Sequence, residues 1–89
     1  MRRTRVPGWW GWPLEFPRHV QERMRQRGFT ETDVRHMLFR VRSIRVSGDI
    51  GRWLVDAELD GNAWRVVLEP DHQDRVIVVI TAFQQGSRQ

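Results

Sequence analysis

The segment "RWLVDAELDGNAWRVVLE", Arg52 to Glu69, decides the fold class. Apolar and polar residues alternate on both sides of its Asp60-Gly61 pair, which is the pattern of two strands that each bury one face. The sequence Asp-Gly-Asn is typical of a tight hairpin turn, because these residues tolerate the backbone angles that such turns need. The segment therefore predicts an antiparallel hairpin whose buried face carries Trp53, Val55, Ala57 and Leu59.

Two further segments with the period of a strand flank this hairpin, "SIRVS" at 43–47 and "RVIVVITAF" at 75–83. The connections "GDIG" and "PDHQD" are short, which favours an antiparallel meander of four strands. The last strand is apolar on both faces from Val76 to Ile80, so we expect it in the centre of the sheet.

The N-terminal half predicts two helices. Pro17 suits the first turn of a helix, since its missing N–H would be unpaired there, and Gly28 is a typical C-terminal stop. Thr30 and Asp33 resemble a capping box for a second helix that reaches about Arg40. Two helices followed by strands predict an α+β domain with both helices packed on one face of a twisted, mainly antiparallel sheet.

The chain has 89 residues, enough for one small domain, which we place at 14–85, followed by a short disordered tail at 86–89. Residues 1–13 contain Pro, Gly and three tryptophans without periodicity, and predict an extended arm. Either the arm folds back and buries its rings, or it exposes an aromatic patch for a partner or for stacked bases. The partner-binding candidates in this arm are Trp9, Trp10 and Trp12.

All 15 basic residues are arginines, against 11 acidic residues, which gives a net charge of +4. This balance suggests a polyanionic partner, although codon bias in a GC-rich genome would also favour arginine over lysine. The absence of cysteine excludes disulfides and thiolate metal sites. No segment approaches the roughly 18 apolar residues of a membrane span, so we expect no membrane partner and a soluble, cytoplasmic protein.

The first helix separates its basic residues into two groups. At about 100° per residue, one side is apolar and is formed by Phe16, Val20 and Met24. Arg18 and Arg25 fall on the far side and are expected to be solvated, whereas His19, Arg23 and Arg27 border the apolar side and point toward the rim of the sheet.

A histidine among fixed positive charges favours its neutral form, which can accept a proton. Such a base can deprotonate the 2′-OH of RNA while guanidinium groups bind the charge on the attacked phosphate, and no metal or other cofactor is needed. The alternative is that His19 is a helix-edge residue bonded to a backbone carbonyl. We interpret His36 and His72 as surface residues, and the crowded Asp71, His72 and Asp74 as a poor zinc site.

A family resemblance rests on "H-x-x-x-R-M-x-x-R-G-F" from His19 to Phe29, the capped second helix, and a hairpin ending in "VVITAF". Over about residues 17–83 the chain resembles the DUF4258 family, which is grouped with the barnase, EndoU, colicin and RelE-like ribonuclease toxins. The resemblance implies a metal-independent endoribonuclease fold in which a helical histidine and arginine face the sheet.

Carried over by position, the resemblance implies four catalytic residues, namely His19, Arg23, Arg65 and Thr81. Arg27, Arg52 and Phe83 are expected to contact RNA. Phe83 stands where many relatives are expected to have tyrosine, and the chain contains no tyrosine, so a catalytic phenol is ruled out. Without the resemblance, Thr81 would be an ordinary strand residue. Strict alternation places Thr81 and Phe83 on the same face as Ile77 and Val79.

Three functions are compatible with these observations. The leading hypothesis is a small endoribonuclease-like toxin domain, with His19 as base or acid and Arg23 and Arg65 as phosphate ligands. The second is an RNA- or protein-binding module of the same fold that does not cleave. The third is a protein-interaction domain that uses the Trp arm. The expected partners are RNA, with or without the ribosome, an antitoxin or immunity protein, and a second copy bound through the arm.

Overall fold

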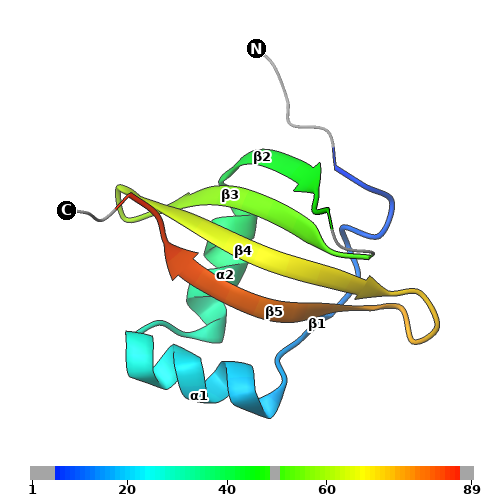
Figure 1. Ribbon diagram of the computed structural model, residues 1–89, viewed down its shortest axis with the longest axis horizontal. Helices are drawn as coiled ribbons and strands as arrows, with labels where there is room; N and C mark the ends of the chain where they lie inside the picture. The colour runs from blue at the N-terminus through cyan, green and yellow to red at the C-terminus, as the bar shows by residue number, and fades with distance from the viewer. Residues whose placement is uncertain (1–5, 49–50, 87–89) are drawn as a thin grey trace.

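The computed structural model describes residues 6–48 and 51–86 and has two helices and a five-stranded sheet (Figure 1). The α+β class predicted from the sequence is confirmed. In chain order the elements are β1 (Leu14–Glu15), α1 (Arg18–Arg27), α2 (Glu31–Phe39), β2 (Val41–Val46), β3 (Trp53–Leu59), β4 (Asn62–Asp71) and β5 (Val76–Gln84).

The sheet is mixed, with the strand order β1-β5-β4-β3-β2. The four predicted strands form the antiparallel meander, but the prediction of four strands was one short. The additional strand, β1, pairs with β5 in parallel, with Leu14 opposite Ile77, and the Ile77 N–H donates to the Pro13 carbonyl at 2.8 Å. A two-residue strand leaves no periodic pattern, which is why the sequence did not reveal it.

Strand β5 is not central, contrary to the prediction from its apolar character. The strand order places β4 in the middle, and β1 pairs with β5 only at Ile77 and Val78. Within the described residues, no strand covers the outer edge of β5 beyond Val78. Helix α1 lies along this side of the sheet instead (Figure 1).

The hairpin predicted around Asp60 and Gly61 is confirmed. Leu59 pairs with Asn62, which leaves Asp60 and Gly61 as a two-residue turn with φ angles of 52° and 81°. Two successive positive φ angles are typical of the turn that matches the twist of an antiparallel pair.

The core lies between the helices and one face of the sheet. Helix α2 passes behind the strands and α1 lies below β5, so no helix of the described chain covers the opposite face of the sheet (Figure 1). The fully buried residues of the sheet include Val55, Val66, Leu68 and Val79, and they pack with buried residues of the helices, including Val20, Met24, Val34 and Met37.

The described part of the N-terminal arm is folded, not extended. Two successive turns join Trp10 N–H to the Pro7 carbonyl at 3.1 Å and Trp12 N–H to the Trp9 carbonyl at 3.0 Å. Trp9 is only 6% exposed and its ring meets that of Trp53 edge-on at 5.3 Å. Trp9 is therefore part of the core, whereas Trp10 and Trp12 pack against the core and stay partly exposed.

The junction between the helices follows the predicted signals. Gly28 has a φ of 77°, which favours glycine, and its N–H donates to the Met24 carbonyl at 2.8 Å. Thr30 and Asp33 form a complete capping box, in which the Asp33 N–H donates to Thr30 Oγ1 at 3.1 Å and the Thr30 N–H donates to the Asp33 carboxylate at 2.9 Å.

The Thr30→Ala variant is expected to lower the free energy of unfolding by about 1 kcal/mol, because the N–H of Asp33 loses its acceptor at the helix terminus. Thr32→Ala is the matched control, since Thr32 is an exposed residue of the same helix and Asp33 keeps its acceptor. Chemical denaturation of both variants gives the comparison. Equal stability of the two variants would contradict a role of the cap.

Candidate functional site

A bulge in β5 decides which face of the sheet carries Thr81. Val67 pairs with Thr81 but Leu68 pairs with Val79, so Ile80 is an extra residue in β5. Paired residues of neighbouring strands point to the same face, and the extra residue therefore reverses the alternation. Thr81 and Phe83 lie on the face of the sheet away from the helices, which we call the open face, whereas Ile77 and Val79 lie on the buried face. The prediction from strict alternation was wrong.

One row of side chains crosses four strands on this open face. Ser43 of β2 is paired with Asp56 of β3, Asp56 with Arg65 of β4, and Arg65 with Phe83 of β5. Thr81 belongs to the next row, opposite Val67. Two of the predicted site residues, Arg65 and Phe83, are thus direct cross-strand neighbours.

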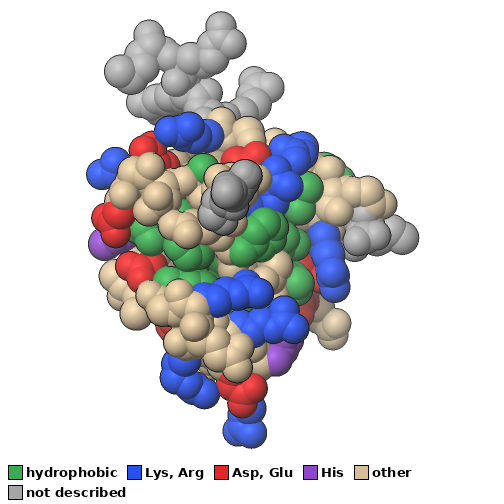
Figure 2. Space-filling model, turned by 60° about the vertical axis from the view of Figure 1, so that its left-hand side comes forward, with side chains coloured by type: hydrophobic (Ala, Val, Ile, Leu, Met, Phe, Trp, Pro, Cys, Tyr) green, Lys and Arg blue, Asp and Glu red, His purple; other side chains and the backbone are tan. Residues whose placement is uncertain are grey.

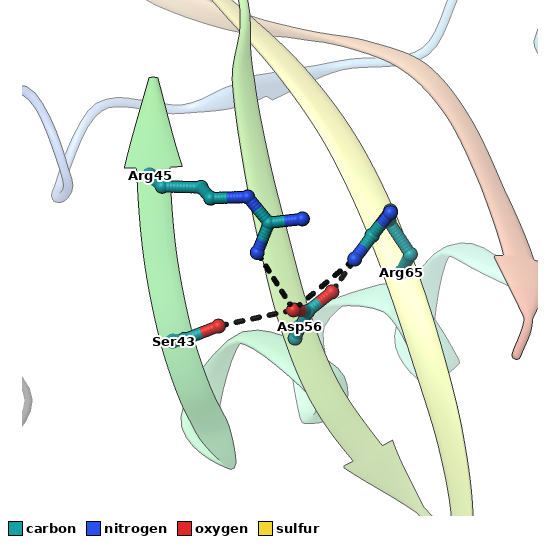
Figure 3. A network of polar contacts seen from close by, with 4 residues as sticks. All are labelled: Ser43, Arg45, Asp56 and Arg65. Carbon is teal, nitrogen blue, oxygen red and sulfur yellow. Dashed lines mark hydrogen bonds and ion pairs between the residues drawn. The ribbon is translucent and has the colours of Figure 1, made fainter. Parts of the chain in front are cut away.

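Asp56 is the centre of a polar network in this row (Figure 3). Arg65 donates from Nε to Oδ1 of Asp56 at 2.8 Å and from Nη2 to Oδ2 at 3.3 Å. The hydroxyl of Ser43 donates to Oδ2 at 3.0 Å, and Nη1 of Arg45 donates to the same oxygen at 3.2 Å. Both side chains of the Asp56–Arg65 pair are more than three-quarters buried, so the carboxylate fixes the guanidinium in one orientation.

The network shifts the ionisation of both partners. The hydrogen bond from Arg65 holds the pKa of Asp56 below its ordinary value of 3.8, with smaller contributions from Ser43 and from the charge of Arg45, against the opposing effect of desolvation. The same hydrogen bond raises the pKa of Arg65. The pair is therefore ionised at neutral pH.

Acidification is expected to remove the contribution of this network to stability. Because the pKa of Asp56 is lower in the folded than in the unfolded chain, the contribution is complete above pH 3.8 and is lost as the pH falls through the lowered value. Thermal denaturation of the wild type and of Asp56→Asn from neutral to acidic pH measures it. The stability difference between the two proteins should shrink in acid, and a constant difference would contradict the assignment.

Arg52 precedes β3, away from this row, and is also paired. Its Nε donates to Glu69 Oε1 at 3.3 Å, with both side chains nearly half exposed. Exposed pairs of this kind contribute little to stability, so Arg52 remains able to exchange the carboxylate for another anion.

The helix α1 presents His19, Arg23 and Arg27 along one side. Arg27 contacts the sheet, since its Nη1 donates to the backbone carbonyl of Ala82 in β5 at 2.8 Å. His19 and Arg23, two and one turns before Arg27, are exposed and make no hydrogen bond or ion pair with any described residue. The alternative in which His19 is bonded to a backbone carbonyl is therefore not observed.

The predicted residues form a band and not a single pocket. His19, Arg23 and Arg27 lie on α1, and Arg65, Thr81 and Phe83 lie on the open face, so the uncovered edge of β5 separates the two groups. Figure 2 shows one end of the molecule, where arginine side chains flank a hydrophobic patch and a histidine lies beside them. We call the six predicted residues of α1, β4 and β5 that lie on either side of this edge the β5-edge band. It consists of His19, Arg23, Arg27, Arg65, Thr81 and Phe83.

Ser43, Arg45 and Asp56 were not predicted as site residues from the sequence. A signal for Asp56 was present, because a two-residue turn at Asp60 and Gly61 fixes Asp56 opposite Arg65. No comparable signal identifies Ser43 and Arg45, since the loop between β2 and β3 does not set a register and β2 contains an irregularity between Val41 and Ser43.

The remaining acidic and histidine residues have other surroundings. The carboxylate of Asp71 accepts from the backbone N–H groups of Gln73 and Asp74 at 3.0 and 3.1 Å and shapes the turn between β4 and β5. His72 meets Trp12 edge-on at 5.4 Å. Over residues 6–48 and 51–86, no three acidic or histidine side chains are grouped as a metal site would require. No helix in these ranges has the length and apolarity to cross a bilayer.

The fold and this surface define a small α+β domain in which a basic helix lies beside the edge strand pair formed by β5 and the short β1. The chain belongs to the DUF4258 family, described as a domain of unknown function, which it matches over residues 16–87. Comparisons with curated proteins and with solved structures gave no match.

Proposed function

We propose that this protein is a metal-independent endoribonuclease-like toxin domain that binds RNA along the β5-edge band and cleaves it by attack of the 2′-OH. The observation that carries the proposal is the contact of Arg27 with the sheet, because it shows which side of α1 faces β5. Within the described residues, the same side presents His19 and Arg23 without a hydrogen-bond or ion-pair partner, next to a part of the β5 edge that no strand covers. An unpaired guanidinium and an unpaired imidazole one turn apart are available to a phosphate and a hydroxyl.

The charges of the band suit a polyanion. Arg23 is exposed and unpaired in the described part of the chain, and Arg45 and Arg65 share the single carboxylate of Asp56, so that group keeps one net positive charge. Arg65 uses Nε and Nη2 for Asp56, which leaves its Nη1 for a phosphate oxygen. Phosphate contacts of this kind position the nucleic acid without reading its sequence.

The neighbours of Arg65 on β5 suit the rest of a nucleotide. Phe83 is 37% exposed beside Arg65, and an aromatic ring next to a cation is a stacking surface for an unpaired base. Thr81, one row further along, supplies a hydroxyl that can donate to a phosphate or ribose oxygen.

The reaction assigned to these residues needs no additional reactant. His19 takes the proton of the 2′-OH, the 2′-oxygen forms a bond to the adjacent phosphorus, and the bond to the 5′-oxygen breaks. The leaving 5′-oxygen takes up a proton from water, and the protonated His19 returns its proton to the solvent, so that the products are a 2′,3′-cyclic phosphate and a 5′-hydroxyl. Arg23 and Arg65 stabilise the charge on the phosphate during the attack. An antitoxin or immunity protein for such a domain would cover the β5-edge band.

A second candidate function is RNA binding without cleavage. The observation that favours it is the bidentate pairing of Arg65 with Asp56, which already occupies two of its donors, in a chain that has no tyrosine for a catalytic phenol. In that case the band would hold RNA, alone or on the ribosome, through the same residues.

Incubation of the purified protein with total RNA in EDTA tests the proposal. Cleavage is expected to proceed, and the 3′ ends of the products should carry a 2′,3′-cyclic phosphate. Intact RNA, together with binding that weakens steeply as salt rises, would favour the non-cleaving module, because counterion release makes phosphate contacts sensitive to salt. Neither cleavage nor salt-dependent binding would reject both functions.

A further inference from the structure

The aromatic side chain at the end of α2 has almost no cover. Phe39 is 86% exposed, more than any other large hydrophobic residue in the described chain. Burial of a phenylalanine side chain stabilises a folded protein, and the exposed ring of Phe39 does not make this contribution. Exposed apolar patches on soluble proteins are typical of interaction surfaces.

Two hollows lie on either side of Phe39, and its side chain lines both of them. The first, of about 360 Å³, lies between α2 and the N-terminal arm and is lined by Trp10, Trp12 and Leu38. The second, of about 410 Å³, lies between the end of α2 and the β3–β4 hairpin and is lined by residues that include Leu59 and Asp60. Phe39 therefore forms a ridge between two depressions.

One residue of each hollow carries a charge opposite to that of a residue in the other hollow. Arg35 is the charged residue of the first hollow, and its contact with Glu31 is long, at 3.9 Å, with both side chains about half exposed. Asp60 lies at the second hollow, is exposed, and has no ion-pair partner among the described residues. Arg40 and Glu58 also line the second hollow, and Glu58 is bound by Arg42 at 2.9 Å, so the two hollows oppose each other in charge only at Arg35 and Asp60.

We propose that two copies of the chain associate through this surface about a twofold axis that passes beside Phe39. In such an interface each surface patch meets the same patch of the partner. A residue on one side of the axis therefore faces the residue that lies on the other side of the axis in the partner copy. The first hollow of one copy then faces the second hollow of the other, the two Phe39 rings meet at the centre, and Arg35 faces Asp60 of the partner copy.

This association is independent of the proposed RNA chemistry. Arg65 and Phe83 lie on the open face of the sheet, whereas α2 packs on the opposite face (Figure 1). A dimer formed through α2 therefore leaves the open face of each copy accessible, and the test below requires no nucleic acid.

Sedimentation velocity of the full chain across micromolar to low millimolar concentrations tests the proposal. The wild type is expected to form a concentration-dependent dimer, and Phe39→Asp should raise its dissociation constant by at least about tenfold, because a buried aromatic anchor at the centre of an interface is replaced by a charge. Phe83→Asp is the matched control, since Phe83 is an exposed aromatic on the other face, and it should leave the dimer unchanged.

A double-mutant cycle locates the contact between the copies. Arg35→Gln and Asp60→Asn should each weaken the dimer severalfold, while the double variant should be no weaker than either single variant, because both remove the same interaction. Asparagine is chosen at position 60 because it tolerates the φ of 52° found there.

A wild type that stays monomeric at every concentration would overturn the proposal. So would a dimer that Phe39→Asp leaves intact while the variant keeps the thermal stability of the wild type. Fully additive effects of Arg35→Gln and Asp60→Asn would overturn the proposed placement of the two hollows.

Discussion

His19→Gln is expected to lower the rate of RNA cleavage by about 100-fold or more, the usual range for the loss of a general base. Glutamine keeps a polar side chain on the exposed side of α1 but cannot accept the proton of a 2′-OH. His19 makes no hydrogen bond or ion pair with the described residues, so its replacement should leave the fold intact. The measurement is the rate of formation of cyclic-phosphate ends on a short RNA at saturating enzyme.

His72→Gln is the matched control for this prediction. His72 is an exposed histidine on the turn between β4 and β5, outside the β5-edge band, and its replacement should leave the cleavage rate unchanged. RNA affinity should change little in His19→Gln, since every arginine of the band stays in place. Equal cleavage rates of the His19→Gln and His72→Gln variants would show that His19 is not the general base. RNA binding by the band would then be measured separately.

Asp56→Asn is expected to weaken RNA binding about tenfold, although it makes the protein more positive. Removal of a negative charge from a polyanion-binding surface would ordinarily strengthen binding. Asp56, however, fixes the guanidinium of Arg65 by two hydrogen bonds and also accepts from Ser43 and Arg45. An asparagine amide offers one acceptor in place of two charged oxygens, and hydrogen bonds to charged groups are worth about 1.5–3 kcal/mol.

Asp74→Asn provides the control for charge alone. Asp74 is exposed on the β4–β5 turn, and its side chain accepts no hydrogen bond from a described residue, so the variant removes the same charge without affecting Arg65. Binding measured by fluorescence anisotropy at one fixed salt concentration compares the two variants. Tighter binding by Asp56→Asn would show that Asp56 opposes the phosphate instead of positioning Arg65, whereas absence of binding by the wild type would reject the RNA function itself.

The local elements of this fold could be predicted because short-range physics fixes them. The Asp60-Gly61 turn needs only residues that accept positive φ angles, and the capping box at Thr30 and Asp33 needs only side chains three residues apart. The helical period likewise placed His19, Arg23 and Arg27 on one side of α1, and the hydrogen bond from Arg27 to β5 shows that this side meets the sheet edge.

The errors in the prediction have long-range causes. Strand β1 exists because Leu14 and Glu15 pair with a strand more than 60 residues later, and a two-residue segment carries no periodic signal of its own. The bulge at Ile80 reversed the faces of Thr81 and Phe83, because an extra residue in one strand is defined only by its partner strand. For the same reason, the apolar character of β5 did not reveal that most of its outer edge lacks a strand.

The sequence by itself determined the two helices, their caps, the β3–β4 hairpin and the basic side of α1, since each depends on residues close together in the chain. Only the tertiary structure decided that Arg65, Thr81 and Phe83 share the open face, that Asp56 holds Arg65, and that Phe39 stands exposed between two hollows. These features depend on register between strands and on the packing of α2 against the arm, and both arise from contacts between distant residues.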